Sequence, residues 1–297
     1  MYHEPVMPNE VIQMLNINPA GTYVDATFGG GGHSRMILQS LNQQGRLLGF
    51  DQDEDVVRNC PDDLRFVFVK ANFRFLRQYL RLNNVNEIDG VLADLGVSSF
   101  QIDSPTRGFS TRFDGPLDMR MDAQQENSAT QIVNSYTVDD LQKIFSEYGE
   151  LRNSKSLAAA VSIEREVKKF ESTSDFKFRL KNAVRGNENK YWAQVFQALR
   201  MEVNDELNSL KEFLTQCGGI LKPGGRIVII SYHSLEDRLV KNYFRSGNIE
   251  GEIEKDFFGV ASKPFELITK KPVTPTEEEI IANPRSRSGR LRAAQKN

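Results

Sequence analysis

The stretch GTYVDATFGGGGHS, residues 21–34, determines how the rest of the chain can be interpreted. Its first half, Gly21 to Phe28, is typical of a buried strand, and four consecutive glycines follow it. Glycine lets the backbone turn tightly and approach a ligand where a Cβ atom would clash. Helical apolar spacing resumes at residues 35–38. The stretch therefore predicts the first strand–turn–helix unit of a nucleotide-binding sheet.

A second strand is expected at residues 46–51, and it ends in Asp51. This acid follows the glycines by about 20 residues, the separation at which a carboxylate meets ribose hydroxyls in such folds. The ligand is therefore expected to carry an adenosine-like ribose.

The glycines do not satisfy either common phosphate-binding motif. In the dinucleotide fingerprint the third glycine would fall on Ser34, and no Gly-Lys-Ser/Thr follows as in a P-loop. S-adenosylmethionine is the remaining candidate for the ligand. The glycine turn would meet its amino-acid end, and Asp51 would meet its ribose. The alternative is that the glycines form only a flexible loop.

Composition narrows the class of protein. The 297 residues carry a net charge of -2, so RNA contact would have to come from local basic patches. The two cysteines, Cys60 and Cys217, lie far apart without neighbouring histidines, which argues against a disulfide framework or structural metal. Neither a signal peptide nor a membrane span is evident. We expect a cytoplasmic, metal-free protein that does not bind membranes, with two domains, as a monomer or homodimer.

The first part of the chain alternates strand and helix patterns. A third strand is expected at 64–73, ending at Phe73, and a fourth at 88–97, which includes Asp94. Such alternation predicts a parallel sheet with helices on both faces. Ligands bind beyond the carboxyl ends of such strands, so Gly31, Asp51, Phe73 and Asp94 should share one edge.

The pattern then changes. Residues 98–122 form a long loop rich in glycine, proline and charge, expected to be ordered and to cover a ligand. A helical pattern follows, so we expect the first part of the sheet domain at 1–121, an inserted helical domain at 122–200 and the second part of the sheet domain at 201–297. Basic residues of the insertion could face RNA or only solvate its helices: Lys168, Lys169, Lys177 and Lys181.

A strand pattern resumes at residues 226–233. His233, Ser234 and Asp237 could suggest the catalytic triad of a hydrolase, but capping of the following helix explains the serine and the acid better. A last strand is expected at 265–269. The final residues form a basic tail, which is a candidate for phosphate contact or a solvated terminus: Arg285, Arg287, Arg290 and Arg292.

Together these motifs closely resemble those of the RsmH/MraW family, bacterial methyltransferases that act on cytosine N4 of 16S ribosomal RNA. The resemblance covers nearly the whole chain, and five residues, Tyr191 to Val195, depart from a Thr-Arg-x pattern that the family often carries. The motifs are His3-x-Pro5-Val6, DATFGGGGHS at 25–34, DLGVSS at 94–99, DGPLDMRMD at 114–122, FQALR at 196–200, HSLEDR at 233–238 and NPR at 283–285.

The resemblance implies a class I S-adenosylmethionine methyltransferase fold, which is α/β with a Rossmann-like parallel sheet, one antiparallel strand and an inserted all-helical domain. It implies S-adenosyl-L-methionine as cofactor and a cytidine in the decoding centre of the small ribosomal subunit as substrate. The cofactor contacts carried over by motif are Gly31, Gly32, His33, Asp51, Phe73, Asp94 and Gln101.

The amino group of cytosine is a poor nucleophile because its lone pair is conjugated into the ring. A nearby acceptor can orient the amine and receive its proton, and an aromatic wall can hold the base flat. Asp94 is the candidate acceptor, with Phe100 and Phe109 as candidate walls. Either aromatic could instead serve loop packing.

Two other classes of function stay open at this point. One is a non-enzymatic assembly factor that binds nucleotide and rRNA without transferring a methyl group, against which the set of strand-end residues argues. The other is a nicotinamide-dependent oxidoreductase, disfavoured by Ser34 in the fingerprint.

Overall fold

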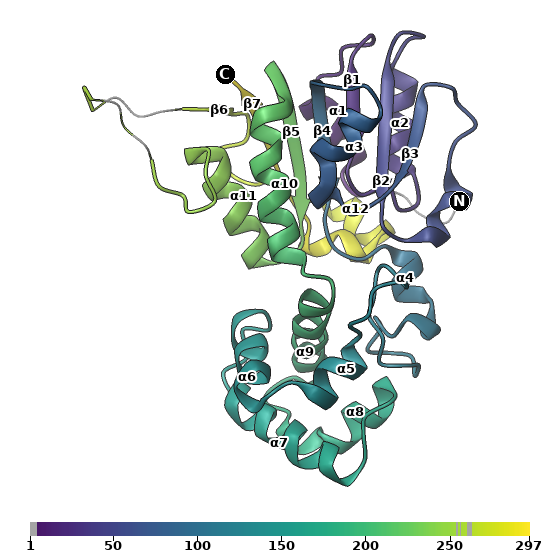
Figure 1. Ribbon diagram of the computed structural model, residues 1–297, viewed down its shortest axis with the longest axis vertical. Helices are drawn as coiled ribbons and strands as arrows, with labels where there is room; N and C mark the ends of the chain where they lie inside the picture. The colour runs from purple at the N-terminus through teal and green to yellow at the C-terminus, as the bar shows by residue number, and fades with distance from the viewer. Residues whose placement is uncertain (1–4, 254, 256, 260–262) are drawn as a thin grey trace. The chain divides into compact units, whose positions relative to one another are not determined.

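The computed structural model describes residues 5–253, 255, 257–259 and 263–297, and its parts are drawn in Figure 1. His3 of the N-terminal motif lies outside the described residues. The chain forms two compact units. The first combines Met1–Gly96 with Leu207–Asn297, and the second is Val97–Glu206.

The first unit contains a seven-stranded sheet in the order β3-β2-β1-β4-β5-β7-β6. Only β7 runs antiparallel to its neighbours, β5 and β6, so the predicted fold class is confirmed. The strands are β1 (Thr22–Asp25), β2 (Arg46–Asp51), β3 (Phe66–Lys70), β4 (Ile88–Asp94), β5 (Leu221–Ser231), β6 (Phe265–Leu267) and β7 (Arg290–Lys296).

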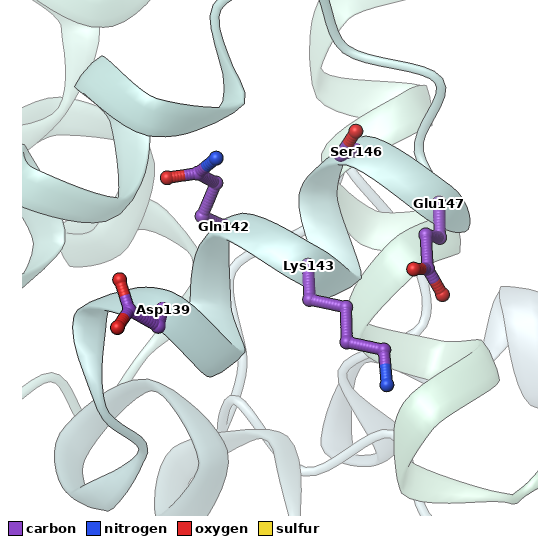
Figure 2. A pocket seen from close by; sticks show the side chains of 5 residues that line it. All are labelled: Asp139, Gln142, Lys143, Ser146 and Glu147. Atoms are coloured by element: carbon purple, nitrogen blue, oxygen red, sulfur yellow. The ribbon is translucent and has the colours of Figure 1, made fainter.

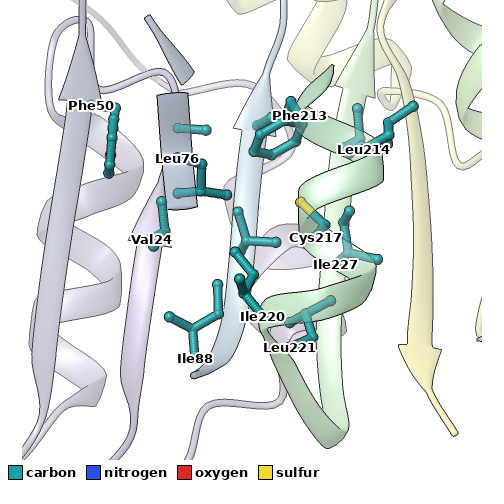
Figure 3. Packing of buried hydrophobic residues seen from close by; sticks show 14 of the residues in the cluster. Val24, Phe50, Leu76, Ile88, Phe213, Leu214, Cys217, Ile220, Leu221 and Ile227 are labelled. Carbon is teal, nitrogen blue, oxygen red and sulfur yellow. The ribbon is translucent and has the colours of Figure 1, made fainter. Parts of the chain in front are cut away.

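Successive residues of the strands face two separate apolar cores, one on each side of the sheet. Val24 packs in the core that α3 and α10 cover (Figure 3), whereas Tyr23 packs in the core that α1 and α2 cover. This alternation follows from the period of two in a strand. The helices of this unit are α1 (Pro8–Leu15), α2 (Gly32–Ser40), η1 (Glu54–Asn59), η2 (Phe73–Phe75), α3 (Leu76–Leu82), α10 (Glu206–Ile220), α11 (Ser234–Ser246), α12 (Glu277–Ala282) and η5 (Pro284–Ser288).

The strand order reverses between β1 and β4, because β2 and β3 extend the sheet on one side of β1 and β4 extends it on the other. In open parallel sheets the crevice beyond the strand ends at such a reversal is where ligands bind. The topology therefore selects the ends of β1, β2 and β4 as the place to look for a site.

The second unit is helical around its own core, which includes Trp192, Phe145 and Phe176. Its elements are α4 (Ser99–Asp103), η3 (Pro105–Arg107), α5 (Ala129–Ser135), α6 (Val138–Glu147), α7 (Ser154–Val167), α8 (Thr173–Arg179), η4 (Lys181–Ala183) and α9 (Glu188–Val203). Across the described residues of both units, no helix is long and apolar enough to cross a membrane.

The second unit begins at Val97, earlier than the boundary at residue 122 that the sequence suggested. The reason is that Leu117, Met119 and Met121 are buried in the helical core. Asn204 fixes this segment, because its side-chain oxygen accepts from the Met121 amide and its side-chain nitrogen donates to the Met119 carbonyl, both at 2.8 Å. The loop at 98–122 is thus part of the insertion.

The basic C-terminus is a second correction, because it is not a solvated tail. Residues Arg290–Lys296 form β7, which pairs with β5 on one side and β6 on the other. Leu291, Ala293 and Ala294 are completely buried. The last strand expected from the sequence was at residues 265–269, and the strand between β5 and β6 was not expected.

Candidate functional site

The glycine turn joins β1 to α2, and its backbone conformation requires glycine. Gly31 has φ of 72°, in the left-handed region, and a Cβ atom there would lie 2.9 Å from the ring of Phe28. Phe28 cannot move aside easily, since its ring packs against Phe66 and Phe68 of β3. At Gly32 a Cβ atom would lie 3.0 Å from Pro5. The predicted glycine turn is therefore confirmed, and neither Gly31 nor Gly32 has space for a Cβ atom.

Asp51, at the end of β2, holds this turn in place. Its Oδ2 accepts from the Gly29 amide at 2.8 Å and its Oδ1 accepts from the Asp53 amide at 2.9 Å. Burial raises the pKa of Asp51 to about 6, against the opposing effect of these two hydrogen bonds. Each carboxylate oxygen has two lone pairs, so both can accept a further hydrogen bond. Asp51 therefore has the capacity to bind a ribose diol.

A buried polar group lies beneath the turn. Ser34 donates to Oδ2 of Asp25 at 2.6 Å, and burial raises the pKa of Asp25. The ring of His33 lies next to it, with Nε2 2.9 Å from the Val6 carbonyl. Since a carbonyl only accepts, Nε2 carries the hydrogen of that bond. His33 and Gly32 are thus structural parts of the turn, and their predicted contact with a cofactor stays a prediction.

Asp94, at the end of β4, is held from three sides. Its amide donates to Oγ1 of Thr27 at 2.7 Å, and the Tyr232 hydroxyl donates to its Oδ1 at 2.7 Å. Its Oδ2 lies 3.9 Å from Nδ1 of His33. Burial raises the pKa of Asp94 to about 6, while His33 and the Tyr232 hydrogen bond act in the opposite direction. The side chain is 23% exposed, so Asp94 is a partly accessible carboxylate with a perturbed pKa.

The structure brings several of the predicted residues together within the first unit. Asp51 accepts from the amide of Gly29 in the turn that also contains the predicted Gly31 and Gly32, and His33 lies beside Asp94. Phe73 begins η2 three residues after the end of β3 and packs edge-on against Phe213, with 5.2 Å between the ring centroids. Three of the four predicted strand-end positions thus surround the reversal point, and Phe73 lies just beyond the third strand.

Three predicted site residues belong to the second unit instead. Gln101 is 4% exposed, and its Oε1 accepts from the Ser98 amide in a capping box of α4. Phe100 is half-buried in the same helix. Phe109 is only 9% exposed and belongs to the helical core, so its prediction as a wall for the base is wrong. Loop packing, the alternative reading, describes Phe109 correctly.

The basic candidates of the insertion differ in their surroundings. Lys168 and Lys169 are exposed, whereas Lys177 donates to the Thr111 carbonyl at 2.7 Å. Lys181 lies over the ring of Phe178, with 4.7 Å from Nζ to the ring centroid. Their predicted contact with RNA is not decided by these positions and stays a prediction.

The four arginines predicted to contact RNA at the C-terminus differ in their exposure to solvent. Arg285 and Arg287 are exposed in η5, and Arg290 is half-exposed at the start of β7. Arg292 is buried, and its Nε and Nη2 donate to the two oxygens of Asp237 at 2.6 and 3.1 Å. The prediction that Arg292 contacts RNA is therefore wrong. Asp237 is equally unavailable for a hydrolase triad with His233.

A hollow on the second unit is formed by α6 alone (Figure 2). Its lining residues are Asp139, Gln142, Lys143, Ser146 and Glu147. The side chains in Figure 2 spread along the outside of one helix, and none of them was a candidate from the sequence. The hollow therefore does not compete with the strand-end site.

The sequence profile of the MraW methylase family matches residues 1–297. The chain belongs to the MraW methylase family. Curated members of similar sequence include proteins named Ribosomal RNA small subunit methyltransferase H. The protein from Parabacteroides distasonis is 53% identical, with 99% of this chain and 97% of that protein covered. The protein from Cytophaga hutchinsonii is 52% identical, with both chains covered completely. The resemblance seen in the sequence is thus confirmed.

Solved structures similar to this MraW methylase are much more distant in sequence. An rRNA methylase from Streptococcus thermophilus is 11% identical, with 100% of this chain and 98% of the other covered, at a TM-score of 0.43. Fibrillarin from Aeropyrum pernix, solved with S-adenosyl-L-methionine, is 12% identical, with 96% and 71% covered, at a TM-score of 0.38. The fold assignment rests on the strand order described above.

Sequence reasoning missed two residues of this MraW methylase site. Thr27 and Tyr232 are the hydrogen-bond partners of Asp94, one from the glycine turn and one from the end of β5. The rule applied to the first four strands, that functional side chains follow strand ends, also selects Tyr232 when it is applied to the fifth.

Proposed function

We propose that this protein methylates the N4 amino group of a cytidine in the decoding centre of 16S rRNA in the small ribosomal subunit. S-adenosylmethionine is the methyl donor. The names of the 52–53% identical relatives support small-subunit rRNA as the substrate. The observation that carries the chemistry is the Asp94 carboxylate, partly exposed at the end of β4 beside the glycine turn.

The residues at the strand ends fit this cofactor. Gly31 and Gly32 keep Cβ atoms away from the turn, and both oxygens of Asp51 can accept from ribose hydroxyls. When bound, the cofactor supplies an electrophilic methyl group on sulfur. We assign Gly31, Gly32, His33, Asp51, Phe73, Asp94 and Gln101 to its binding.

Asp94 has the chemistry of the proton acceptor. Forming the new bond between carbon and nitrogen makes the amine acidic, and one of its protons must leave to a base. With a pKa of about 6, Asp94 is ionised near neutral pH and is a stronger base than an ordinary aspartate. Its backbone is fixed by Thr27, so the carboxylate does not have to reorganise as the reaction proceeds.

We assign recognition of the subunit to the inserted helical unit, with Phe100 as the candidate wall for the flipped base. Exposed lysines suit a surface that meets phosphates, since each contact releases counterions. Lys168 and Lys169 are exposed there. Arg285 and Arg287 are further candidates on η5, because their side chains are also exposed.

The test is methyl transfer from labelled cofactor to small subunits purified from cells in which the gene has been deleted. Nucleoside mass spectrometry should identify N4-methylcytidine with the wild-type protein. Asp94→Asn should lower the rate by roughly 10²–10⁴-fold, the usual contribution of a general base.

Asp89→Asn is the matched control, because Asp89 lies on the same strand but pairs with Lys222. An assembly factor without catalytic activity would bind cofactor and subunit and yield no methylated nucleoside. Unimpaired transfer by Asp94→Asn would contradict the role of Asp94 alone.

A further inference from the structure

Tyr232 lies directly after β5 and reaches across to the neighbouring strand. In the parallel pairing of β4 with β5, Asp94 is opposite Ile230, so Tyr232 is two residues beyond that partner. Its hydroxyl donates to Oδ1 of Asp94 at 2.7 Å. An oxygen-to-oxygen distance of this kind is typical of a strong bond between a hydroxyl and a carboxylate.

Both residues of this pair are anchored through their backbones. The Asp94 amide donates to Oγ1 of Thr27 at 2.7 Å, and the Tyr232 amide donates to Oε2 of Glu236 at 3.0 Å. Glu236 is 3% exposed, so this acceptor is itself fixed within the fold. The phenol therefore reaches Asp94 from a rigid position.

The groups that face Asp94 come from four elements. Tyr232 follows β5, His33 lies on α2, Asp25 ends β1 and Glu236 lies on α11. Burial and the carboxylates Asp94 and Glu236 raise the pKa of the Tyr232 phenol well above its ordinary range. The phenol therefore keeps its proton near neutral pH and acts as the donor in its hydrogen bond to Asp94.

We infer that Tyr232 is a positioning residue for methyl transfer: it holds Oδ1 of Asp94, so that Oδ2 is the oxygen that receives the proton of the amine. The inference rests on the proposed function, in which Asp94 accepts that proton. Tyr232 touches neither substrate nor the reacting atoms in this scheme. It acts by occupying Oδ1 and by stabilising the ionised form of Asp94.

The consequence is a defined change in pH dependence. A hydroxyl that donates to a carboxylate favours the ionised form, so its removal raises the pKa of that carboxyl. With the pKa of Asp94 at about 6, single-turnover transfer by the wild type should rise with a midpoint near pH 6. In Tyr232→Phe the midpoint should move to about pH 7, the size expected for one lost charge-assisted hydrogen bond.

This shift has a selective effect on rate. At pH 6 the ionised fraction of Asp94 would fall from about one half to about one tenth, which slows transfer roughly fivefold. At pH 8 Asp94 is almost fully ionised in both proteins, so the rates of Tyr232→Phe and the wild type should differ by less than at pH 6. Affinity for S-adenosylmethionine, measured by calorimetry at pH 8, should stay within about twofold of the wild type.

Tyr243→Phe is the matched control, since Tyr243 is a buried tyrosine of α11 whose hydroxyl faces Gly218 of α10. It should leave the midpoint near pH 6. A Tyr232→Phe profile that matches the wild type overturns the inference. So does a rate that falls equally at all pH values, because that pattern indicates only a structural role.

A second variant keeps the test decisive if Tyr232→Phe does not fold. Replacing Tyr232 with 3,5-difluorotyrosine preserves size and strengthens the donor, so the midpoint should move below pH 6. An unchanged midpoint in this folded variant overturns the inference. Failure of the proposed function is seen separately, because the wild-type protein would then produce no N4-methylcytidine.

Discussion

Arg292 offers a direct test of how the C-terminal strand is held. Its guanidinium donates to both oxygens of Asp237, and the two side chains are 9% and 12% exposed. Arg292→Ala would leave the Asp237 carboxylate buried without its main partner. The strand itself should tolerate alanine, because Ala293 and Ala294 already follow at buried positions of β7.

The expected loss can be estimated from this geometry. Removing one member of a buried ion pair costs about 3–5 kcal/mol, mostly because the remaining charge is uncompensated. Arg290 offsets part of the loss, since its Nη1 lies 3.6 Å from Oδ2 of Asp237, but its side chain is 49% exposed and its charge is screened. We therefore expect the free energy of unfolding of the first unit to fall by about 2–4 kcal/mol.

Native-state hydrogen exchange of the β7 amides measures this free energy in the first unit. The fluorescence of Trp192, the single tryptophan, follows the second unit in the same samples. Arg287→Ala is the control, because Arg287 is exposed, and it should change stability by less than about 0.5 kcal/mol. If Arg292→Ala has an equally small effect, the buried ion pair does not stabilise the sheet as inferred here.

Three further variants test the site. Asp51→Ala should weaken S-adenosylmethionine binding by about 1–3 kcal/mol through loss of a charged acceptor, and calorimetry showing unchanged affinity in the folded variant would remove its ribose role. Asp94 is ionised above pH 6 although its side chain is largely shielded from water, a state that costs the fold up to about 3 kcal/mol relative to a carboxyl of pKa 3.8. Because the folded protein binds this proton more tightly than the unfolded chain, the cost appears as pH rises from about 4 through 6. Asp94→Asn should therefore be more stable than the wild type by about 1–2 kcal/mol at pH 8, after allowing for a weaker Tyr232 bond, and urea unfolding should show no such gain near pH 4. The last variant replaces four lysines of the insertion with Glu: Lys168, Lys169, Lys177 and Lys181. It should reduce single-turnover methylation of small subunits but keep the cofactor affinity measured by calorimetry. Normal methyl transfer would exclude a role of these lysines in RNA binding.

The sheet could be predicted where local sequence determines structure. Four apolar runs separated by helical patterns determine β1 to β4, and the glycines at 29–32 together with Asp51 identify the turn and its anchor. These features are close together in sequence, so their spacing carries the information.

Long-range pairing could not be predicted in the same way. Five of the seven residues of β7 are arginine, alanine or lysine, so its sequence is typical of a solvated terminus. It becomes an interior strand, next to the edge, because β5 and β6 pair with it and because Asp237 neutralises Arg292. Phe109 was misjudged for a related reason, since only the three-dimensional core shows that the loop around it is packed.

The interrupted path of the chain through the sheet affects how the protein can fold during synthesis. During synthesis β4 leaves the ribosome first, and the segment Val97–Glu206 follows it. The strand that pairs with β4, which is β5, leaves the ribosome only after that segment. Until then the nascent sheet ends in β4, whose Val91, Leu92 and Ala93 are fully buried in the complete fold. Closing a flexible loop of this length costs roughly 4 kcal/mol in chain entropy, and a helical unit that folds first shortens the effective loop. Early folding of the insertion would thus protect an apolar strand edge from pairing with other chains. The insertion would then assist folding of the enzyme, independently of any recognition of RNA.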